Sequence, residues 1–307
     1  MKIGVIGLGF MGATHVDAFS KLDGVQVSAV CTRDARAAAG DFRHIGGNLG
    51  RNAGVHDFSQ VRNHQDWREL VSDPSLDAVD ICLPTDLHAP VSVLALQAGK
   101  HVLCEKPMAL NFADCEGMIA AAREAHRVLM IGHVLRFWPE YLYLQKFVRD
   151  AQYGPIQSAT FSRSTGLPDW SRWLPNESKS GGAVLDLLIH DIDQALHLFG
   201  TPQTVAGRTL HYSRGLEVNI EGGWLAPGTP FSSGFRVKAE KAELALTPEG
   251  LMLRQDGHQQ KLDVSGRDAY EAELAYFADC CRKNAQPEQC PPRESAEAVK
   301  IALQLKS

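Results

Sequence analysis

A glycine-rich turn near the N-terminus constrains this chain more than any other feature of its sequence. The segment GLGFMG at positions 7–12 follows a short apolar run and opens a segment with helical character. At this spacing the first glycine permits a tight turn, the second lets the backbone approach a pyrophosphate, and the third lets helix and strand pack closely. The N-terminus of that helix presents unpaired N–H groups and a partial positive charge to phosphates. The turn therefore predicts a dinucleotide site at Gly7, Gly9, Phe10, Met11 and Gly12.

Strand-like and helix-like segments alternate around this turn as far as residue 131. Strands are predicted at 2–6, 25–31, 78–83, 101–104 and 128–131, and helices at 12–22, 34–42, 66–72, 87–98 and 111–126. A Gly- and Asn-rich stretch at 46–54 is expected to be a long loop. This rhythm is typical of a parallel sheet with helices on both faces. Residues 1–131 are therefore predicted to form a doubly wound α/β domain of the Rossmann type.

The pattern changes after residue 131. Alternation with a period of two predicts strands at 156–163, 217–224, 231–239 and 242–247, flanked by helices near 183–199 and 270–283. Such strands favour an α+β domain with a mostly antiparallel, open sheet. A length of 307 residues also agrees with two domains at about 150 residues each. We expect residues 132–307 to bind substrate and to mediate oligomerisation.

The composition excludes several classes of protein. Hydrophobic residues make up 44% of the chain and charged residues 22%, which is ordinary for a globular protein. The 31 basic and 36 acidic residues give a net charge of -5, which offers no electrostatic footprint for nucleic acid or an anionic membrane. No apolar stretch approaches the roughly 18 residues of a membrane span, and the N-terminus lacks the features of a signal peptide. We therefore expect a cytoplasmic protein whose seven cysteines are thiols.

The end of the second predicted strand bears on the choice of cofactor. An NAD site usually places an acidic residue about 20 positions beyond the glycine turn, where it faces the ribose hydroxyls. Here that position is Thr32, followed by Arg33 and, one turn later, by Arg36. Thr32 does not repel a 2′-phosphate, and Arg33 can pair with one in a fork geometry. The sequence thus predicts NADP in preference to NAD, although Asp34, which also suits a helix N-cap, stands beside these residues.

A Glu-Lys-Pro step at residues 105–107 directly follows the strand predicted at 101–104. In an open α/β sheet, ligands bind beyond the carboxyl ends of the strands. Lys106 is therefore expected near the nicotinamide end of the cofactor site, with Glu105 beside it. The alternative is an ordinary surface lysine at the end of a strand.

Asp186 and His190 form a second candidate pair. They are four residues apart in a segment that is apolar on nearly every side, which predicts one helix face and burial. A buried carboxylate and imidazole need partners, and a pair that faces a cleft supplies a tunable proton acceptor. The alternatives are a structural Asp–His pair and a metal site. We expect no metal, because the stripe that continues to Asp193 and His197 is about 16 Å long, too long for one ion.

Taken together, these motifs resemble the Gfo/Idh/MocA oxidoreductase family. The resemblance extends over nearly the whole chain and adds the segments LPTDLH at 83–88, GKHVLCEKP at 99–107 and GHVLRFWP at 132–139. It implies a Rossmann domain followed by a mostly antiparallel open sheet. It also implies an enzyme that transfers a hydride between NAD(P) and a hydroxyl or keto carbon of a sugar, an inositol or a related polyol.

The resemblance implies roles for individual residues as well. Lys106 matches the lysine of the family's Glu-Lys-Pro step, and Asp186 and His190 match the pair on its helix. Pro84 and Thr85 match the loop beside the cofactor. Two more residues of the same motifs are cofactor candidates: Glu105, and His88 with a structural role as its alternative.

The chemistry of hydride transfer gives the two basic groups different tasks. The hydroxyl proton must leave as the carbonyl forms, and an unperturbed histidine titrates near neutral pH whereas a lysine is almost fully charged there. We therefore expect His190 to accept the proton. Lys106 is expected to donate a charged hydrogen bond to the reacting oxygen, and Asp186 to bind a neighbouring hydroxyl or orient the substrate.

Other polar and aromatic side chains are candidates for the substrate site. They are His133, Arg136 and Tyr141 after the last predicted Rossmann strand, and Trp170, Arg172 and Trp173 in a Pro-flanked loop. An aromatic wall suits the apolar face of a sugar ring. Ordinary packing is the alternative for each of them. The remaining histidines, His15, His44, His56 and His64, are expected to be structural or exposed.

Two other functions are compatible with the sequence. The same lysine and histidine would serve an NAD-dependent glycosidase, which oxidises its substrate transiently before elimination. A regulator that senses a dinucleotide would need no catalytic groups, yet Lys106, Asp186 and His190 are all present. The expected partners are a small sugar or polyol and further copies of the chain, since an exposed sheet face often pairs subunits in a homodimer or homotetramer.

Overall fold

The computed structural model describes residues 1–47, 54–168 and 171–306. The chain forms two compact units. The N-terminal unit consists of Met1–His133 and Tyr270–Ala296, and the C-terminal unit of Val134–Ala269 and Glu297–Ser307. The expected boundary after residue 131 lies close to the first change of unit, whereas the sequence does not predict the return of the chain to the N-terminal unit at Tyr270.

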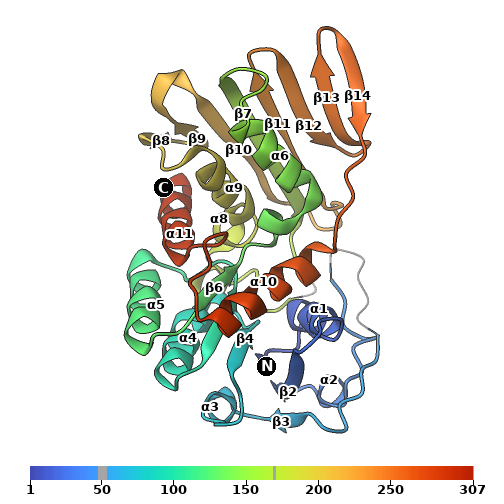
Figure 1. The fold of residues 1–307 in the computed structure, drawn as a ribbon, viewed down its shortest axis with the longest axis vertical. Helices are drawn as coiled ribbons and strands as arrows, with labels where there is room; N and C mark the ends of the chain where they lie inside the picture. The colour runs from blue at the N-terminus through green and yellow to red at the C-terminus, as the bar shows by residue number, and fades with distance from the viewer. Residues whose placement is uncertain (48–53, 169–170, 307) are drawn as a thin grey trace. The chain divides into compact units, whose positions relative to one another are not determined.

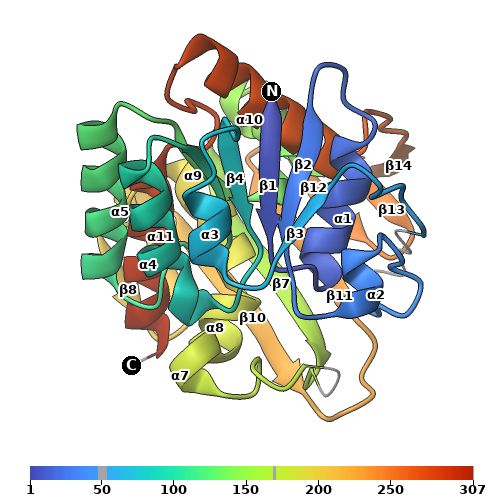
Figure 2. The ribbon, with the colours of Figure 1, turned by 90° about the horizontal axis from the view of Figure 1, so that it is seen from below.

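The N-terminal unit contains a parallel sheet of six strands in the order β3-β2-β1-β4-β5-β6. The strands are β1 (Lys2–Ile6), β2 (Gln26–Cys31), β3 (Arg62–His64), β4 (Ala78–Ile81), β5 (His101–Glu105) and β6 (Leu129–Gly132). This order is that of a doubly wound dinucleotide-binding sheet, so the predicted Rossmann fold is confirmed. Figure 2 shows β4, β1 and β2 side by side. The strand order reverses between β1 and β4, which is where such sheets bind their ligands.

Most helices of this unit begin where the alternation predicts them. They are α1 (Phe10–Phe19), α2 (Ala35–Ala38), α3 (Trp67–Val71), the 3₁₀ turn η1 (Thr85–Leu87), α4 (His88–Gln97), α5 (Phe112–Ala125) and α10 (Ala269–Lys283). Side chains of Asp34, Asp66 and Asn111 accept backbone N–H groups at the starts of α2, α3 and α5. Helix α2 is shorter than the helix predicted at 34–42, because the chain turns at Gly40, whose φ is 82°.

Helix α10 belongs to the N-terminal unit, where it contacts α1 and the turn that follows α1. Glu271 forms an ion pair with Lys21 at 3.0 Å, and Arg282 donates to the carbonyl of Asp23 at 3.0 Å. The Tyr270 ring lies against the ring of His15, with 6.1 Å between centroids. These contacts explain why a segment predicted in the second domain belongs to the N-terminal unit.

The C-terminal unit contains a sheet of eight strands in the order β14-β13-β12-β11-β7-β10-β9-β8. The strands are β7 (Ile156–Gly166), β8 (Thr204–Ala206), β9 (Thr209–His211), β10 (Glu217–Leu225), β11 (Ser232–Ala239), β12 (Ala242–Thr247), β13 (Gly250–Gln255) and β14 (His258–Leu262). Among the described strands of this second sheet, only β7 and β10 pair in parallel, so the predicted mostly antiparallel sheet is confirmed.

Helices cover one face of this second sheet (Figure 1). The helical segments are η2 (Val134–Phe137), α6 (Pro139–Arg149), α7 (Glu177–Ser180), α8 (Gly182–Asp186), α9 (Ile189–Phe199), η3 (Ser213–Gly215) and α11 (Pro292–Lys306). Phe161 of β7 and Phe235 of β11 are buried on the covered face, and Tyr141 of α6 meets Phe235 edge-on at 5.2 Å. The single helix predicted over 183–199 is wrong, because the chain forms α8 and α9 with a break at Leu187 and Leu188.

Two features that composition predicts concern membrane spans and cysteines. None of the helices within the described residues is both long and apolar enough to cross a membrane. All seven cysteines are free thiols, as predicted. The cytoplasmic location stays a prediction.

Candidate active site

The glycine turn places three glycines in three different environments. Gly7 takes a φ of 92°, and a Cβ there would lie 2.4 Å from the carbonyl oxygen of Cys82. A Cβ on Gly12 would lie 2.0 Å from the carbonyl oxygen of Gly7. At Gly9, by contrast, a Cβ would meet no described atom within 4 Å. Gly7 and Gly12 are thus required by packing, whereas Gly9 leaves an open approach to the N-terminus of α1, as a bound pyrophosphate needs.

Asp34, which follows β2, makes contacts with its own neighbours in the chain and with His44. The Asp34 carboxylate accepts the N–H groups of Arg36 and Ala37 and lies 2.6 Å from the ring of His44. The hydrogen bond from His44 lowers the pKa of Asp34. Arg36 pairs with Asp41 at 2.9 Å. The side chains of Asp34 and Arg36 are therefore held within this corner.

Thr32 and Arg33 complete the same corner. Thr32 accepts the N–H of Asp34 at 3.1 Å, and Arg33 is exposed. Asp34 and Arg36 are thus paired within this corner, and Arg33 is exposed beside them.

The beginning of the predicted 46–54 loop packs on the glycine turn. A Cβ on Gly47 would lie 2.2 Å from the Phe10 ring, so this backbone rests directly on that side chain. An antiparallel bridge between Asp41 and Val55 closes the base of the loop. Residues 48–53 lie outside the described part of the chain. Gly47 thus packs against Phe10, a predicted cofactor residue.

His88 connects the loop after β4 with the turn after β5, both of which are expected at the cofactor. It is buried, and its ring nitrogens lie 2.7 Å from the carbonyl oxygen of Pro107 and 2.8 Å from that of Leu83. Thr85, in the same loop as Pro84, is buried as well. The peptide bond between Lys106 and Pro107 is cis. His88 therefore holds the loop after β4 against the turn that carries Lys106, which is the structural alternative considered for it.

Glu105, a predicted cofactor residue, belongs to a buried cluster of charged groups with His15 and Asp80. The ring of His15 lies 2.9 Å from a carboxylate oxygen of Asp80 and 3.2 Å from one of Glu105. Burial alone would lower the pKa of His15, but the Asp80 carboxylate raises it well above 6.5. Burial would raise the pKa of Glu105, but the hydrogen bond and charge of His15 lower it. Sequence reasoning missed this cluster, and its only signal was a histidine three residues after Gly12.

His15 and Asp80, together with Cys82, are spaced closely enough to hold a metal ion, since their ligand atoms lie within 4.8 Å of one another. The 2.9 Å contact between His15 and Asp80 is, however, the length of a charged hydrogen bond. We therefore interpret the cluster as an ion pair.

Asp186 and His190 lie on either side of the break between α8 and α9. The N–H groups of Leu187 and Leu188 both bond to the carbonyl of Ala183, at 2.9 and 3.0 Å, which ends the first helix. Asp186 therefore ends α8 and His190 belongs to α9, so the expectation that one helix carries both residues is wrong. Both side chains are nevertheless half-buried, while the leucines between them are buried. The two polar groups thus keep partial exposure in an otherwise apolar segment.

Two buried ion pairs hold α9 in place directly after His190. Asp191 bonds with Arg163 of β7 through both carboxylate oxygens, at 2.9 and 3.1 Å. Asp193 bonds in the same way with Arg136 of η2, at 2.9 and 2.6 Å. Burial raises the pKa of Asp191 and the Arg163 guanidinium opposes that rise; the bidentate geometry requires the ionised carboxylate. Removing one partner of such a pair typically costs about 3–5 kcal/mol.

The predicted substrate residues divide into separate groups. Arg136, expected to line the substrate site, is instead fully buried against Asp193. His133 is buried, and Tyr141 accepts a hydrogen bond from Arg163 at 3.3 Å, while burial raises the pKa of Tyr141 to about 12. Arg172 is exposed and Trp173 half-buried, so both are accessible to a ligand. Trp170 lies outside the described residues.

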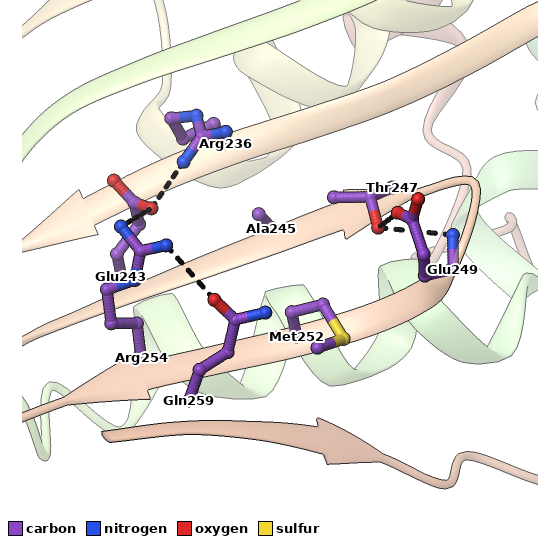
Figure 3. A pocket seen from close by; sticks show the side chains of 8 residues that line it. All are labelled: Arg236, Glu243, Ala245, Thr247, Glu249, Met252, Arg254 and Gln259. Carbon is purple, nitrogen blue, oxygen red and sulfur yellow. Dashed lines mark hydrogen bonds and ion pairs between the residues drawn. The ribbon is translucent and has the colours of Figure 1, made fainter. Parts of the chain in front are cut away.

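A shallow pocket of about 200 Å³ lies on the other face of the C-terminal sheet (Figure 3). Glu243 pairs with Arg236 and lies 4.0 Å from Arg254, which donates to Gln259 at 3.0 Å. Thr247 donates to Glu249 at 2.6 Å. These polar groups satisfy one another, and the strand register sets them on the face opposite to Phe161 and Phe235.

Fold and sites together define a dinucleotide-binding protein of two units. The family model described as "Oxidoreductase family, NAD-binding Rossmann fold" matches residues 1–133, and that described as "GFO/IDH/MocA C-terminal domain" matches residues 141–221. The chain belongs to the Gfo/Idh/MocA family of oxidoreductases, which confirms the predicted family, and it carries an NAD(P)-binding Rossmann fold.

Named relatives support this membership. A 1,5-anhydro-D-fructose reductase of Ensifer adhaerens is 30% identical over 244 residues, which cover 71% of this chain and 73% of the reductase. A levoglucosan dehydrogenase of Pseudarthrobacter phenanthrenivorans is 30% identical over 208 residues, or 65% of this chain. The matched part of the chain spans about half of that dehydrogenase, 51% of its length.

Solved structures show the same fold over the whole chain. A 3-ketoreductase from Actinomadura kijaniata, in complex with NADP, superimposes with a TM-score of 0.84 at 19% identity and covers 100% of this chain and 97% of its own. The aldose-aldose oxidoreductase of Caulobacter crescentus gives a TM-score of 0.82 at 21% identity, covering 100% and 96%.

The three environments of the glycine turn predict separable effects of adding a methyl group. Gly9→Ala should lower the affinity for reduced cofactor by about tenfold or more, because its Cβ would fill the approach to α1, while the thermal unfolding midpoint stays the same. Gly12→Ala should lower the midpoint, because its Cβ would overlap the carbonyl of Gly7. Fluorescence titration and thermal melts measure both.

Gly117→Ala is the matched control for these variants. Gly117 lies on the exposed side of α5, where a Cβ would meet no described atom within 4 Å. This variant should bind cofactor as the unaltered protein does and gain stability of about 0.5–1 kcal/mol. Unchanged cofactor affinity in Gly9→Ala would contradict the assignment of the turn.

Proposed function

We propose that this protein is an NAD(P)-dependent oxidoreductase that transfers a hydride between the nicotinamide and a hydroxyl or keto carbon of a sugar, an inositol or a related polyol. The observation that carries the proposal is the open approach to α1 above Gly9, at the point where the strand order reverses. It supplies a place for the pyrophosphate in a chain that also carries Lys106, Asp186 and His190.

The proposed reaction assigns each of the three groups one task. The bound nicotinamide supplies or accepts the hydride at C4. His190 takes the hydroxyl proton during oxidation and returns it during reduction, since a neutral imidazole accepts protons near pH 7. Lys106 donates a charged hydrogen bond to the reacting oxygen and stabilises its developing negative charge. Asp186 binds a neighbouring hydroxyl and orients the substrate.

Two features of the C-terminal unit support this assignment. His190 and Asp186 are half-buried, so a ligand can reach them, while the residues between them are buried. The ion pairs of Asp191 and Asp193 with their arginines fix the helix that carries His190. A proton acceptor must be held within hydrogen-bond reach of its proton, and such anchoring meets that need.

The substrate class is proposed from the relatives and from the accessible side chains. The names of related enzymes refer to levoglucosan, inositols and 1,5-anhydrofructose, all of them rings rich in hydroxyl groups. Arg172 and Trp173 are the predicted substrate residues that remain accessible, and Trp173 offers an aromatic face to a sugar ring. Trp170, which lies outside the described residues, stays a candidate from sequence.

NADP is the proposed cofactor. Thr32 stands where an NAD site usually has an acid, and the carboxylate of Asp34 is engaged by α2 and His44. Arg33 is exposed beside them and suits a 2′-phosphate.

The chain is further proposed to form a homodimer or homotetramer through the face of the C-terminal sheet that α6 and α9 do not contact. This face carries Thr160 and Ser162 of β7 together with the charged residues around the pocket of Figure 3. Light scattering of the purified chain should give a multiple of the protomer mass, and a monomer would contradict this part of the proposal.

The direct test of function is a panel of sugars, inositols and keto sugars with each nicotinamide cofactor, followed by the absorbance of the reduced form. We expect turnover with at least one member of the panel. His190→Ala should bind cofactor normally and lose about 10²- to 10⁴-fold in turnover, the usual contribution of positioned proton transfer. His197→Ala, a substitution on the same helix, is the control and should retain activity.

Full activity of His190→Ala would contradict the assigned proton acceptor. Cleavage of aryl glycosides without net reduction of cofactor would instead reveal the glycosidase that the sequence also allows.

The cofactor preference has its own test. Titration by fluorescence should give tighter binding of NADPH than of NADH, and Arg33→Ala should weaken NADPH binding by about tenfold while leaving NADH binding unchanged, because only NADPH carries the phosphate. Arg149→Ala, a surface arginine at the end of α6, is the control. Tighter binding of NADH by the unaltered protein would contradict the preference.

A further inference from the structure

We propose that His15 is a positioning residue for Lys106: its imidazolium, held between Asp80 and Glu105, fixes the Glu105 carboxylate, which in turn accepts the backbone N–H of Lys106. The inference rests on the proposed function of Lys106. It assigns a task to a histidine that sequence analysis expects to be structural or exposed, and to a glutamate expected at the cofactor.

The contacts form a continuous path through one unit. His15 lies on α1, three residues after Gly12, and its Nδ1 is 2.9 Å from an oxygen of Asp80 on β4. Its Nε2 is 3.2 Å from Oε1 of Glu105, the last residue of β5. The N–H of Lys106 donates to Oε2 of Glu105 at 3.1 Å. The helix that begins at the glycine turn is thus connected to the backbone of Lys106.

The protonation state follows from the two contacts of the imidazole ring. The Nδ1 of the ring is within hydrogen-bond distance of Asp80, and its Nε2 lies in ion-pair contact with Glu105 at 3.2 Å. Two carboxylates this close to one buried ring favour the positively charged imidazolium, which carries a proton on each nitrogen. The side chains of His15 and Asp80 are fully buried, and that of Glu105 is 8% exposed. The ring of Phe19 meets His15 edge-on at 6.5 Å, and Tyr270 lies on another side, so the cluster sits in apolar surroundings. One cation here compensates two carboxylates that burial would otherwise destabilise.

Glu105 is confined from its other side too. A Cβ on Gly132 of β6 would lie 3.2 Å from Oε1 of Glu105, so this glycine makes room for the carboxylate. Without the imidazolium, Glu105 would take up a proton, which makes it a weaker acceptor for the Lys106 N–H, or turn away, which removes the acceptor. A displacement of about 1 Å of a group that contacts the reacting atoms can cost on the order of 10²-fold in rate.

The test compares His15→Gln with a variant that removes another buried cation from the same unit. Lys100→Gln is that control: Lys100 is buried just before β5 and donates to the carbonyls of Asp73 and Leu76 at 2.6 and 2.8 Å, at the opposite end of the strand from Lys106. His15→Gln should lower kcat about 10- to 100-fold and keep the dissociation constant of the cofactor within about threefold. Lys100→Gln should lower the unfolding midpoint and keep kcat.

A second readout needs no substrate. Hydrogen exchange of the Lys106 amide, followed by NMR, should become faster in His15→Gln than in the unaltered protein, and remain unchanged in Lys100→Gln, because only the first variant releases Glu105. Absence of turnover with every sugar, together with this change in exchange, would refute the proposed function while supporting the positioning role.

A second variant guards against misfolding of the first. Glu105→Gln removes the other end of the same ion pair, so it should lower kcat similarly, and the double variant should lose no more than the worse single variant. Unaltered kcat and unaltered exchange of Lys106 in His15→Gln would overturn the proposal. So would equal losses of kcat in Lys100→Gln, or one equivalent of metal bound by the purified chain and lost with His15.

Discussion

The close approach of Gly12 to the carbonyl of Gly7 is the contact on which the N-terminal unit depends. It brings α1 against β1 at the point where the strand order reverses, and it leaves the space above Gly9 open. Because α1 is held there, His15 reaches Asp80 and Glu105 in the interior of the sheet. The position of α1, which depends on Gly12, therefore leaves space for a pyrophosphate above Gly9. The same position brings His15 to Glu105, which accepts the N–H of Lys106.

In the C-terminal unit, ion pairs rather than close glycine contacts hold the helix that carries a proposed catalytic residue. The segment from Val184 to Ile192 is largely apolar, and the charged residues that follow His190 add directional contacts to its hydrophobic packing. The bidentate pairs of Asp191 with Arg163 and of Asp193 with Arg136 give α9 a fixed rotation and position. His190 precedes Asp191 directly, so its place is determined by the first of these pairs. In each unit a buried ion pair includes the sequence neighbour of a residue with a proposed role: Glu105 precedes Lys106, and Asp191 follows His190.

The sequence predicts the features that depend on local patterns, and it misses those that depend on distant partners. The glycine turn, the buried strands and the Asp34 cap of α2 follow from spacing and composition within a few residues. The pairing of Arg136 with Asp193 joins residues 57 positions apart, and no local pattern in the sequence predicts it. The break between α8 and α9 falls at Leu187 and Leu188. Because both residues are apolar, the hydrophobic pattern continues through the break and does not reveal it. Strand β3 was missed because its three residues are polar and poorly buried.

In the proposed reaction a hydride passes directly between the nicotinamide and a carbon atom of a sugar or polyol, while the proton travels separately through His190. A single turnover with reduced cofactor dideuterated at C4 and a keto sugar in ordinary water, followed by NMR of the product, tests it most directly. We predict deuterium on the carbinol carbon of the product. Ordinary hydrogen on that carbon would contradict the account.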